Sequence, residues 1–333
     1  MKTYKHLFEE VCSFENILKA SKNAQKGKRF TAGVLTFNYQ LESNLLTLRD
    51  ELLAGTYIPG NYRTFYIFDP KHRKISAAPY RDRVVHHAVC NILVPIWDRQ
   101  MIDDNYACRK GKGSHEAITR FHQFARRYDY VLKCDIRKFF DSIDHATLKQ
   151  LLFKQLRDLR LNRLLDLIIE STHSSVGLPL GNLTSQWFAN MYLNHFDHYI
   201  KETLRCKGYI RYMDDFVIFS DSKVELREVK TRITDYLCQI HLSLHDRKCK
   251  TWPLVNGVSF LGFKIYPTHR VLLKRNVHRV KRRFAYFQRA FKARTISTET
   301  IRVSVASWLG HLKWGDTYRL KQNLLERFVL SRE

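Results

Sequence analysis

Residues 208–220 read GYIRYMDDFVIFS, in which two runs of β-branched and aromatic residues enclose the acidic pair Asp214-Asp215. Runs of this composition favour β-strands, so the sequence predicts strands over 209–213 and 215–220 joined by a tight turn. Adjacent carboxylates repel each other, and burying either one without a counter-charge is costly. A divalent cation at the tip of the hairpin would offset that repulsion. Taken alone, the pair fits an ordinary Asp-Asp turn at the surface equally well.

A third carboxylate, Asp135, ends another predicted strand. That strand covers 130–135 (YVLKCD) and is followed by IRKFFDSIDH. An acid at the end of one strand can meet acids at the tip of a neighbouring hairpin. Three converging carboxylates suit two Mg²⁺ ions about 3.5–4 Å apart, an arrangement used for in-line phosphoryl transfer. One ion would activate an attacking 3′-hydroxyl and the other would stabilise the leaving pyrophosphate, with Mn²⁺ as a substitute metal.

The loop between these two acidic motifs is the third informative segment. It begins GLPLGNLTSQ at Gly177. Gly177 and Gly181 allow the backbone to approach a bound base or template closely. Ser185 and Gln186 then begin a helix whose polar groups face the same space. The order of the three segments along the chain favours one shared site.

Composition limits the function classes. The 333 residues are 44% hydrophobic, which excludes wholesale disorder, and the formal net charge is +25. Such an excess predicts a polyanionic partner, nucleic acid above all; the alternative is a basic surface that only aids solubility. Seven cysteines without a CxxC pair argue against a zinc ribbon or a disulfide framework and predict reduced thiols. With no signal peptide and no long apolar run, we expect a cytoplasmic protein without a membrane partner.

The fold class predicted from periodicity is α+β, a small antiparallel sheet backed by helices with a basic helical tail. Extended chain is expected over 56–78 and a hairpin or strand pair over 257–267. Helices are predicted over 5–25, 38–54, 80–101, 114–127, 145–156, 161–170, 183–203 and 223–241.

Together these segments resemble a reverse transcriptase. Asp135–Phe140 resembles motif A, Gly177–Gln186 motif B, and Tyr212–Asp215 motif C. Lys248 resembles motif D and Phe260–Phe263 motif E, while 71–93 resembles the fingers block of bacterial enzymes. The likeness covers roughly 56–265. It implies a right-hand polymerase fold whose parts are an N-terminal helical extension (1–55), fingers (56–129), a palm (130–265, with motif B in 177–190) and a basic helical thumb (266–333).

Within that superfamily the chain is most similar to the enzymes of diversity-generating retroelements. Their motif B pattern, Gly-x-Pro-x-Gly-x-Leu-Thr-Ser-Gln, matches GLPLGNLTSQ, and their Ala-Ser-Trp-x-Gly-His pattern matches Ala306–His311. Group II intron enzymes differ, with Gln in place of Leu180. The resemblance implies a bacterial or phage-encoded enzyme that copies a template-repeat RNA into cDNA with errors opposite adenines. It also implies dNTP substrates and a small helical accessory protein, often a pentamer.

The resemblance also assigns roles to single residues. Asp135, Asp214 and Asp215 would be the catalytic metal ligands, with Ile136 in the same metal site. Phe140 would exclude a ribose 2′-hydroxyl, although core packing beside Phe139 is the alternative. Substrate contacts are expected from Arg73, Lys74, Leu180, Gly181, Gln186 and Lys248. Nucleic-acid contacts are expected from Arg81, Arg83, Arg279, Lys281, Arg282 and Arg283. A helix-start arginine often pairs with a nearby acid instead, and for Trp308 we favour core packing.

Other functions share parts of this pattern. An antiviral-defence reverse transcriptase would use the same chemistry. An RNA-binding scaffold without catalysis is disfavoured by the three intact carboxylates. A two-metal nuclease is disfavoured by the ordered fingers, motif B and thumb segments. Template identity, priming site and oligomeric state are not encoded in recognisable motifs.

Overall fold

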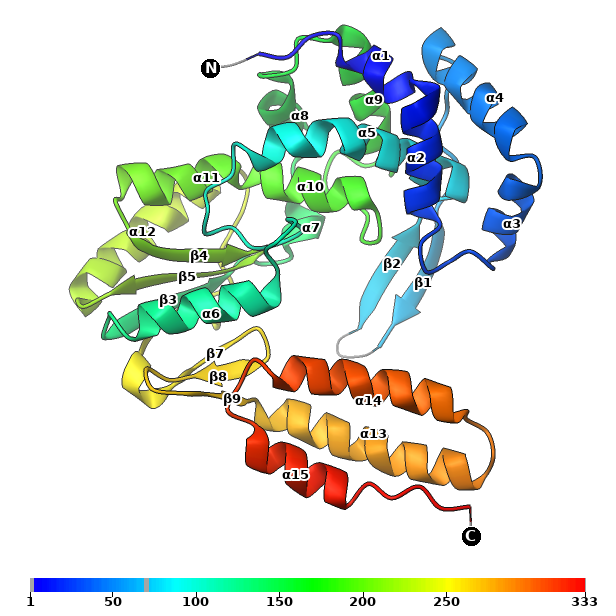
Figure 1. Ribbon diagram of the computed structural model, residues 1–333. Coiled ribbons are helices and arrows are strands. Elements are labelled where there is room, and N and C mark those ends of the chain that lie inside the picture. The colour runs from blue at the N-terminus through cyan, green and yellow to red at the C-terminus, as the bar shows by residue number, and fades with distance from the viewer. Residues whose placement is uncertain (1–2, 69–71, 333) are drawn as a thin grey trace. The chain divides into compact units, whose positions relative to one another are not determined.

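The computed structural model describes residues 3–68 and 72–332, whose helices and strands are labelled in Figure 1. These residues form two compact units. The first unit contains the chain up to Asp103, then Asp135–Leu204 and Arg232–His245. The second contains Asp104–Cys134, Arg205–Thr231 and the chain from Asp246 onward. None of the helices in the described ranges combines the length and apolarity that crossing a bilayer requires.

The first unit begins with four helices; the first three pack against a fifth, and the fourth packs against the second. They are α1 (Leu7–Cys12), α2 (Phe14–Ala24), α3 (Ala32–Tyr39), α4 (Leu41–Ala54) and α5 (Tyr80–Asp98). The helix predicted over 5–25 is two helices, because the backbone of Ser13 is extended and its hydroxyl accepts a hydrogen bond from the Asn16 amide as an N-cap. α2 packs along α5 and buries Ile17, Ala20 and Ala24.

An antiparallel hairpin projects from this helical layer. It consists of β1 (Arg63–Ile67) and β2 (Arg73–Ala77), with Arg63 opposite Ala77 and Ile67 opposite Arg73. The extended chain predicted over 56–78 therefore contains two strands. Most side chains of the hairpin are exposed, which suits an element that contacts a ligand more than one that builds a core.

The remaining helices of the first unit surround motif B. They are α7 (Phe139–Ser142), α8 (His145–Phe153), α9 (Leu159–Glu170), α10 (Leu183–Tyr192), α11 (Asn194–His198) and the π-helical turn η1 (Tyr199–Thr203). The helix predicted over 183–203 is divided at Leu193, where the backbone leaves helical geometry. In the core, the ring of Phe188 meets Trp97 edge to face, with ring centres 6.1 Å apart.

The second unit is built on a four-stranded sheet. Its strand order is β4 (Gly208–Tyr212), β5 (Asp215–Ser220), β3 (Tyr130–Asp135) and β6 (Lys250–Pro253). β4 and β5 form the predicted antiparallel hairpin, and β6 pairs antiparallel with β3. Helix α6 (Ser114–Ala125) covers this sheet, since Phe121 contacts Phe219 of β5; the same ring also stacks on Phe260, which lies outside the sheet. Helix α12 (Lys223–Gln239) contributes residues to both units.

A second sheet and three helices complete this unit. After a short 3₁₀ turn, η2 (Leu254–Asn256), come β7 (Val258–Phe260), β8 (Phe263–Ile265) and β9 (Arg270–Leu272), paired antiparallel in that order. The helices are α13 (Lys274–Lys292), α14 (Thr298–Leu312) and α15 (Tyr318–Glu326). Their shared core contains Phe284, Phe287, Phe291, Ile301 and Leu324. The tail predicted as wholly helical from 266 thus starts with a strand, β9.

Candidate functional site

The acidic turn between β4 and β5 is a two-residue turn, Met213-Asp214. Tyr212 pairs with Asp215 across the hairpin, and Met213 has a left-handed backbone with φ of 56°. Both carboxylates are half-buried. The fully buried Arg211 donates from Nη1 to the Met213 carbonyl at 3.2 Å, and this bond fixes the turn. The predicted hairpin tip is therefore present, with a cationic side chain at its base.

Arg211 is a residue whose importance the sequence analysis missed. Its amide donates to the Asp104 carbonyl at 3.0 Å, and its own carbonyl accepts from the Tyr106 amide at 3.0 Å. Asp104 is itself buried and pairs with Arg120 Nε at 2.8 Å. The sequence did contain a sign of its importance, namely a cation inside the otherwise apolar run YIRY, because a charge is rarely buried without partners.

Asp135 is the last residue of β3, the strand beside β5 in the sheet order, and it is half-buried. Its carbonyl accepts from the His245 amide at 2.8 Å, and the buried Ile136 bridges to Leu244. Within residues 3–68 and 72–332, no group of three or more His, Cys, Asp or Glu side chains forms a metal-binding cluster. The convergence of the three carboxylates stays a prediction.

The motif B loop is fastened at its start to the segment that follows Asp135. The Gly177 amide donates to the Ile143 carbonyl and the Leu178 amide to the Phe140 carbonyl, each at 2.8 Å. The buried His145 donates from Nε2 to the Gly177 carbonyl at 2.7 Å. His145 is thus a packing and hydrogen-bonding residue, and it holds motif B against α7 and α8.

The other end of the loop is fastened to the hairpin. The Ser76 amide donates to the Leu180 carbonyl at 2.9 Å. Gly181 has a φ of 128°, and a Cβ built there would lie 3.0 Å from the Ser76 carbonyl oxygen. A residue larger than glycine would be strained and would push the loop from β2. Leu180 and Gly181 therefore lie against the same hairpin that carries Arg73 and Lys74.

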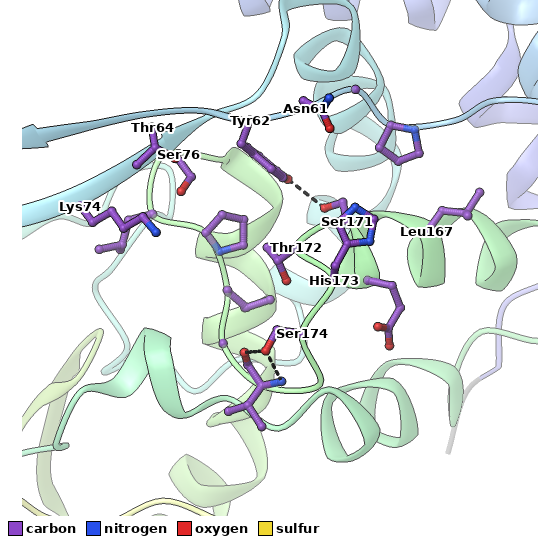
Figure 2. A pocket seen from close by; sticks show the side chains of 18 of the residues that line it. Asn61, Tyr62, Thr64, Lys74, Ser76, Leu167, Ser171, Thr172, His173 and Ser174 are labelled. Atoms are coloured by element: carbon purple, nitrogen blue, oxygen red, sulfur yellow. Dashed lines mark hydrogen bonds between the residues drawn. The ribbon is translucent and has the colours of Figure 1, made fainter.

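A cavity of about 830 Å³ opens beside this loop. Its walls are 58–64 with Lys74 and Ser76 on one side, and 167–180 with Asp141 on the other. Figure 2 shows the Tyr62 hydroxyl directed at Ser171, with 2.9 Å between the two oxygens. Asn182 Nδ2 also donates to the Tyr62 hydroxyl at 2.8 Å, and burial raises the Tyr62 pKa. The size suits one nucleotide, and hydroxyl groups line much of the wall.

The two phenylalanines of motif A have different environments. Phe139 is buried, whereas Phe140 is half-buried and meets Phe139 edge to face at 5.7 Å. Because the Phe140 carbonyl also accepts from Leu178, its backbone is tied to motif B. The half-buried position suits an aromatic ring at the border of open space. Exclusion of a ribose 2′-hydroxyl by this ring stays a prediction.

The predicted basic contacts fall into two groups. Arg81 pairs with Glu51 and lies over the Tyr57 ring, and Arg83 donates to the Ala24 carbonyl with a pKa lowered by burial. Arg81 thus pairs with an acid, as the alternative for helix-start arginines anticipated, whereas Arg83 binds a backbone carbonyl. The nucleic-acid role of both arginines stays untested. The cations predicted elsewhere are exposed, namely Arg279, Lys281, Arg282 and Arg283 on α13 and Lys248 in the turn before β6.

The remaining predicted residues are placed as follows. Gln186 is half-buried in the first turns of α10. Trp308 is half-buried and meets Phe284 edge to face at 5.3 Å, as expected for a core residue. Trp314 stacks on His115 at 4.6 Å.

Comparison with known proteins finds one matching family and several similar proteins. The family described as Reverse transcriptase (RNA-dependent DNA polymerase) matches residues 68–265. Protein YkfC of Escherichia coli (strain K12) is 27% identical over 285 residues, covering 71% of this chain and 73% of YkfC. The Group II intron-encoded protein LtrA of Lactococcus lactis subsp. cremoris is 25% identical over 170 residues, covering 48% of this chain and 28% of LtrA. Apo telomerase from Candida tropicalis is similar with a TM-score of 0.49 at 14% identity, over 64% of this chain and 48% of that one.

Proposed function

Because the chain belongs to the reverse transcriptase (RNA-dependent DNA polymerase) family, we propose that it extends a primer with dNTPs on an RNA template, using Asp135, Asp214 and Asp215 as metal ligands. The family match confirms the predicted fold class, a right-hand polymerase fold of α+β type, and the enzyme class at the level of the family. The observation that carries the proposal is the acidic turn held by the buried Arg211.

The donor set fits two Mg²⁺ ions. Carboxylate oxygens are the ligands that Mg²⁺ prefers, and both acidic residues of the turn are only half-buried. The backbone of Ile136 completes the proposed metal site beside Asp135. When bound, the ions would activate the 3′-hydroxyl and stabilise the leaving pyrophosphate.

The chain's own residues would orient the substrates. Arg73 and Lys74 are exposed on β2, from which they would neutralise triphosphate charge. Leu180 and Gly181, held to β2 through Ser76, would border the nascent base pair. The cavity beside motif B supports an RNA template, because its size suits one nucleotide and hydroxyl groups can recognise a ribose 2′-hydroxyl.

Primer extension on a defined RNA template tests the assignment. Asp214→Asn should lower DNA synthesis by at least about 10³-fold, because the loss of one carboxylate weakens charge stabilisation in the transition state. The exposed Asp235 on α12 gives a matched control, since Asp235→Asn makes the same change outside the site. Circular dichroism and RNA binding should be unchanged in both variants. If Asp214→Asn keeps a tenth of the wild-type DNA synthesis, the assignment of Asp214 to the catalytic site is refuted.

We further propose that the enzyme serves a diversity-generating retroelement in the cytoplasm of a bacterium, with a pentameric helical accessory protein as partner. The GLPLGNLTSQ loop and the Ala306–His311 pattern support this assignment. The Leu180 side chain supplies no hydrogen-bond donor or acceptor at a position where many relatives have Gln. Loss of one discriminating hydrogen bond costs about 1–3 kcal/mol, or roughly five- to one-hundred-and-sixty-fold in selectivity.

The misincorporation spectrum tests this finer assignment. Wild type should misincorporate mostly opposite template adenines, Leu180→Gln should reduce those errors, and Arg73→Ala should change their frequency. All three proteins would copy one RNA containing each base in several contexts. If wild type copies adenine as faithfully as the other bases, the retroelement role fails and an antiviral role becomes the better interpretation.

A further inference from the structure

Two buried cysteines lie together directly before the first acidic motif. Cys134 is on β3 and Cys249 immediately precedes β6, and their Sγ atoms are 2.7 Å apart. Cys134 is fully buried and Cys249 is 3% exposed. Both are thiols in the structure. The proposed polymerase chemistry uses neither sulfur.

The strand register makes these residues cross-strand partners. In the antiparallel β3–β6 pair, Tyr130 lies opposite Pro253 and Lys133 opposite Lys250. One step further along the same register, Cys134 faces Cys249. Directly opposed residues of antiparallel strands have Cα atoms about 4.5–5.5 Å apart. That spacing falls within the roughly 4.4–6.8 Å that a disulfide spans, so a bond can form without unfolding either strand.

We propose that Cys134 and Cys249 are a redox modification site that closes to a disulfide and slows the polymerase reversibly. With hydrogen peroxide as oxidant, the Cys249 sulfur attacks one peroxide oxygen, the O–O bond breaks, and a sulfenic acid and water form. The Cys134 sulfur then displaces hydroxide from the sulfenic acid, and the second water carries away the remaining proton. Two thiols are oxidised by two electrons, and one peroxide is reduced to two waters.

The edge position of β6 gives the oxidant a route to these sulfurs. β6 is the last strand in the sheet order and has four residues, and Trp252 on it is 46% exposed. A short edge strand opens locally at lower free energy than a central strand. The Cys249 carbonyl accepts from Lys230 Nζ at 3.2 Å, while its sulfur already lies 2.7 Å from that of Cys134.

The bond would act on the site through its neighbours in sequence. Cys134 is followed by Asp135, and Cys249 is preceded by Lys248, both of which the proposed function places in the reaction. A covalent bond of about 2.05 Å draws the two sulfurs together. Catalytic groups tolerate displacements of only about 0.5 Å before activity falls. The effect on DNA synthesis rests on the proposed function, whereas formation of the disulfide does not.

The test oxidises the intact protein with hydrogen peroxide, blocks remaining thiols and analyses tryptic peptides by mass spectrometry. A peptide linked through Cys134 and Cys249 should form in wild type and disappear with dithiothreitol. DNA synthesis should fall at least about tenfold on oxidation and recover on reduction. Cys249→Ser and Cys134→Ala should resist this loss. Cys238→Ser, at an exposed cysteine of α12, should behave as wild type.

Two results would overturn the proposal. One is the absence of the linked peptide in oxidised wild type, a readout that requires no variant to fold. The other is an equal loss of activity in oxidised Cys249→Ser, which would assign the loss to another oxidation. If reduced wild type makes no DNA while the linked peptide forms, the polymerase assignment fails and the disulfide stands.

Discussion

At the scale of single residues, the contrast between Phe139 and Phe140 leads to a prediction. Phe140→Ala should admit ribonucleotides into the product, because removal of a half-buried ring opens space next to the sugar. The expected loss of discrimination is about ten- to two-hundred-fold, the range for one small steric difference in an apolar pocket. The measurement compares incorporation of dNTP and rNTP from single-turnover rates.

The control for this prediction is the neighbouring ring. Phe139→Ala removes a buried side chain, so it should lower the free energy of unfolding by about 3–5 kcal/mol without selective entry of ribonucleotides. An active Phe140→Ala enzyme with unchanged discrimination would show that Phe140 is a packing residue.

The residues that the sequence identified and those it missed differ in a physical respect. The acidic pair and the motif B glycines carry their signal in local sequence, since chemistry and backbone conformation at one position restrict the residue type. Arg211, which was missed, acts through the backbone carbonyl of Asp104 and the backbone amide of Tyr106, both in a distant segment. Any residue can supply a carbonyl, so the sequence contains no mark of these partners.

At the scale of elements, the amphipathic helix α13 predicts that the affinity for template–primer depends on salt concentration. Phe284 and Phe287 are buried on one side, while Lys281, Arg282 and Arg283 are exposed. If those cations bind phosphates, affinity for template–primer falls log-linearly with salt. Arg282→Glu with Arg283→Glu should lower the slope by about 0.7–0.9 for each phosphate that the variant no longer neutralises.

Arg302 provides the matched control for α13. It is exposed on α14 and already pairs with Glu299 at 2.7 Å, so Arg302→Glu reverses a charge in the same way without removing a predicted phosphate contact. Template–primer binding is measured by fluorescence anisotropy between about 50 and 300 mM salt. The slope against salt should fall in the Arg282→Glu, Arg283→Glu variant and stay as in wild type in Arg302→Glu. Equal slopes in all three proteins would indicate that this face of α13 binds something other than nucleic acid.

Helix α5 carries a stability prediction. Burial lowers the pKa of His86 to about 3, and burial together with Arg83 lowers that of His87 to about 4. In the unfolded chain both would bind protons near pH 6.5. The unfolded state therefore gains protons first as pH falls, and the free energy of unfolding should drop below pH 6.5. The slope is up to about 1.4 kcal/mol per pH unit for each histidine.

Urea unfolding between pH 7 and pH 4 measures this dependence. His86→Gln removes one titrating group and should flatten the curve by about half. His278 on α13 is exposed and shows no comparable burial, so His278→Gln should leave the curve as in wild type. If His86→Gln loses stability between pH 7 and pH 4 as steeply as wild type, the acid sensitivity comes from the carboxylates.

Element boundaries show where sequence patterns stop being sufficient. Most predicted helices and the 208–220 hairpin are confirmed, because their apolar spacing reflects the face that is buried. The break at Leu193 and the strand β6 were missed. β6 is a four-residue edge strand with alternate exposure, and so short a segment gains its structure from pairing with β3 more than from its own composition.

At the scale of the whole molecule, composition predicted a nucleic-acid protein, and family membership agrees with that interpretation. The division into two units was not predicted, since the predicted boundaries follow the chain in order. Contacts instead join segments distant in sequence, such as β3 with β6, and no linker composition marks where the chain passes from one unit to the other.

That interleaving has a consequence for biosynthesis. The chain passes between the units after Asp103, Cys134, Leu204, Thr231 and His245. During translation, the first unit lacks a segment until His245 has left the ribosome, and the sheet of the second lacks β6 until later still. The nascent chain must therefore hold two incomplete cores at once, and we expect it to expose apolar surface for longer during synthesis than a protein of consecutive domains. Recombination between related genes at a single crossover would give a hybrid in which at least one core is mismatched.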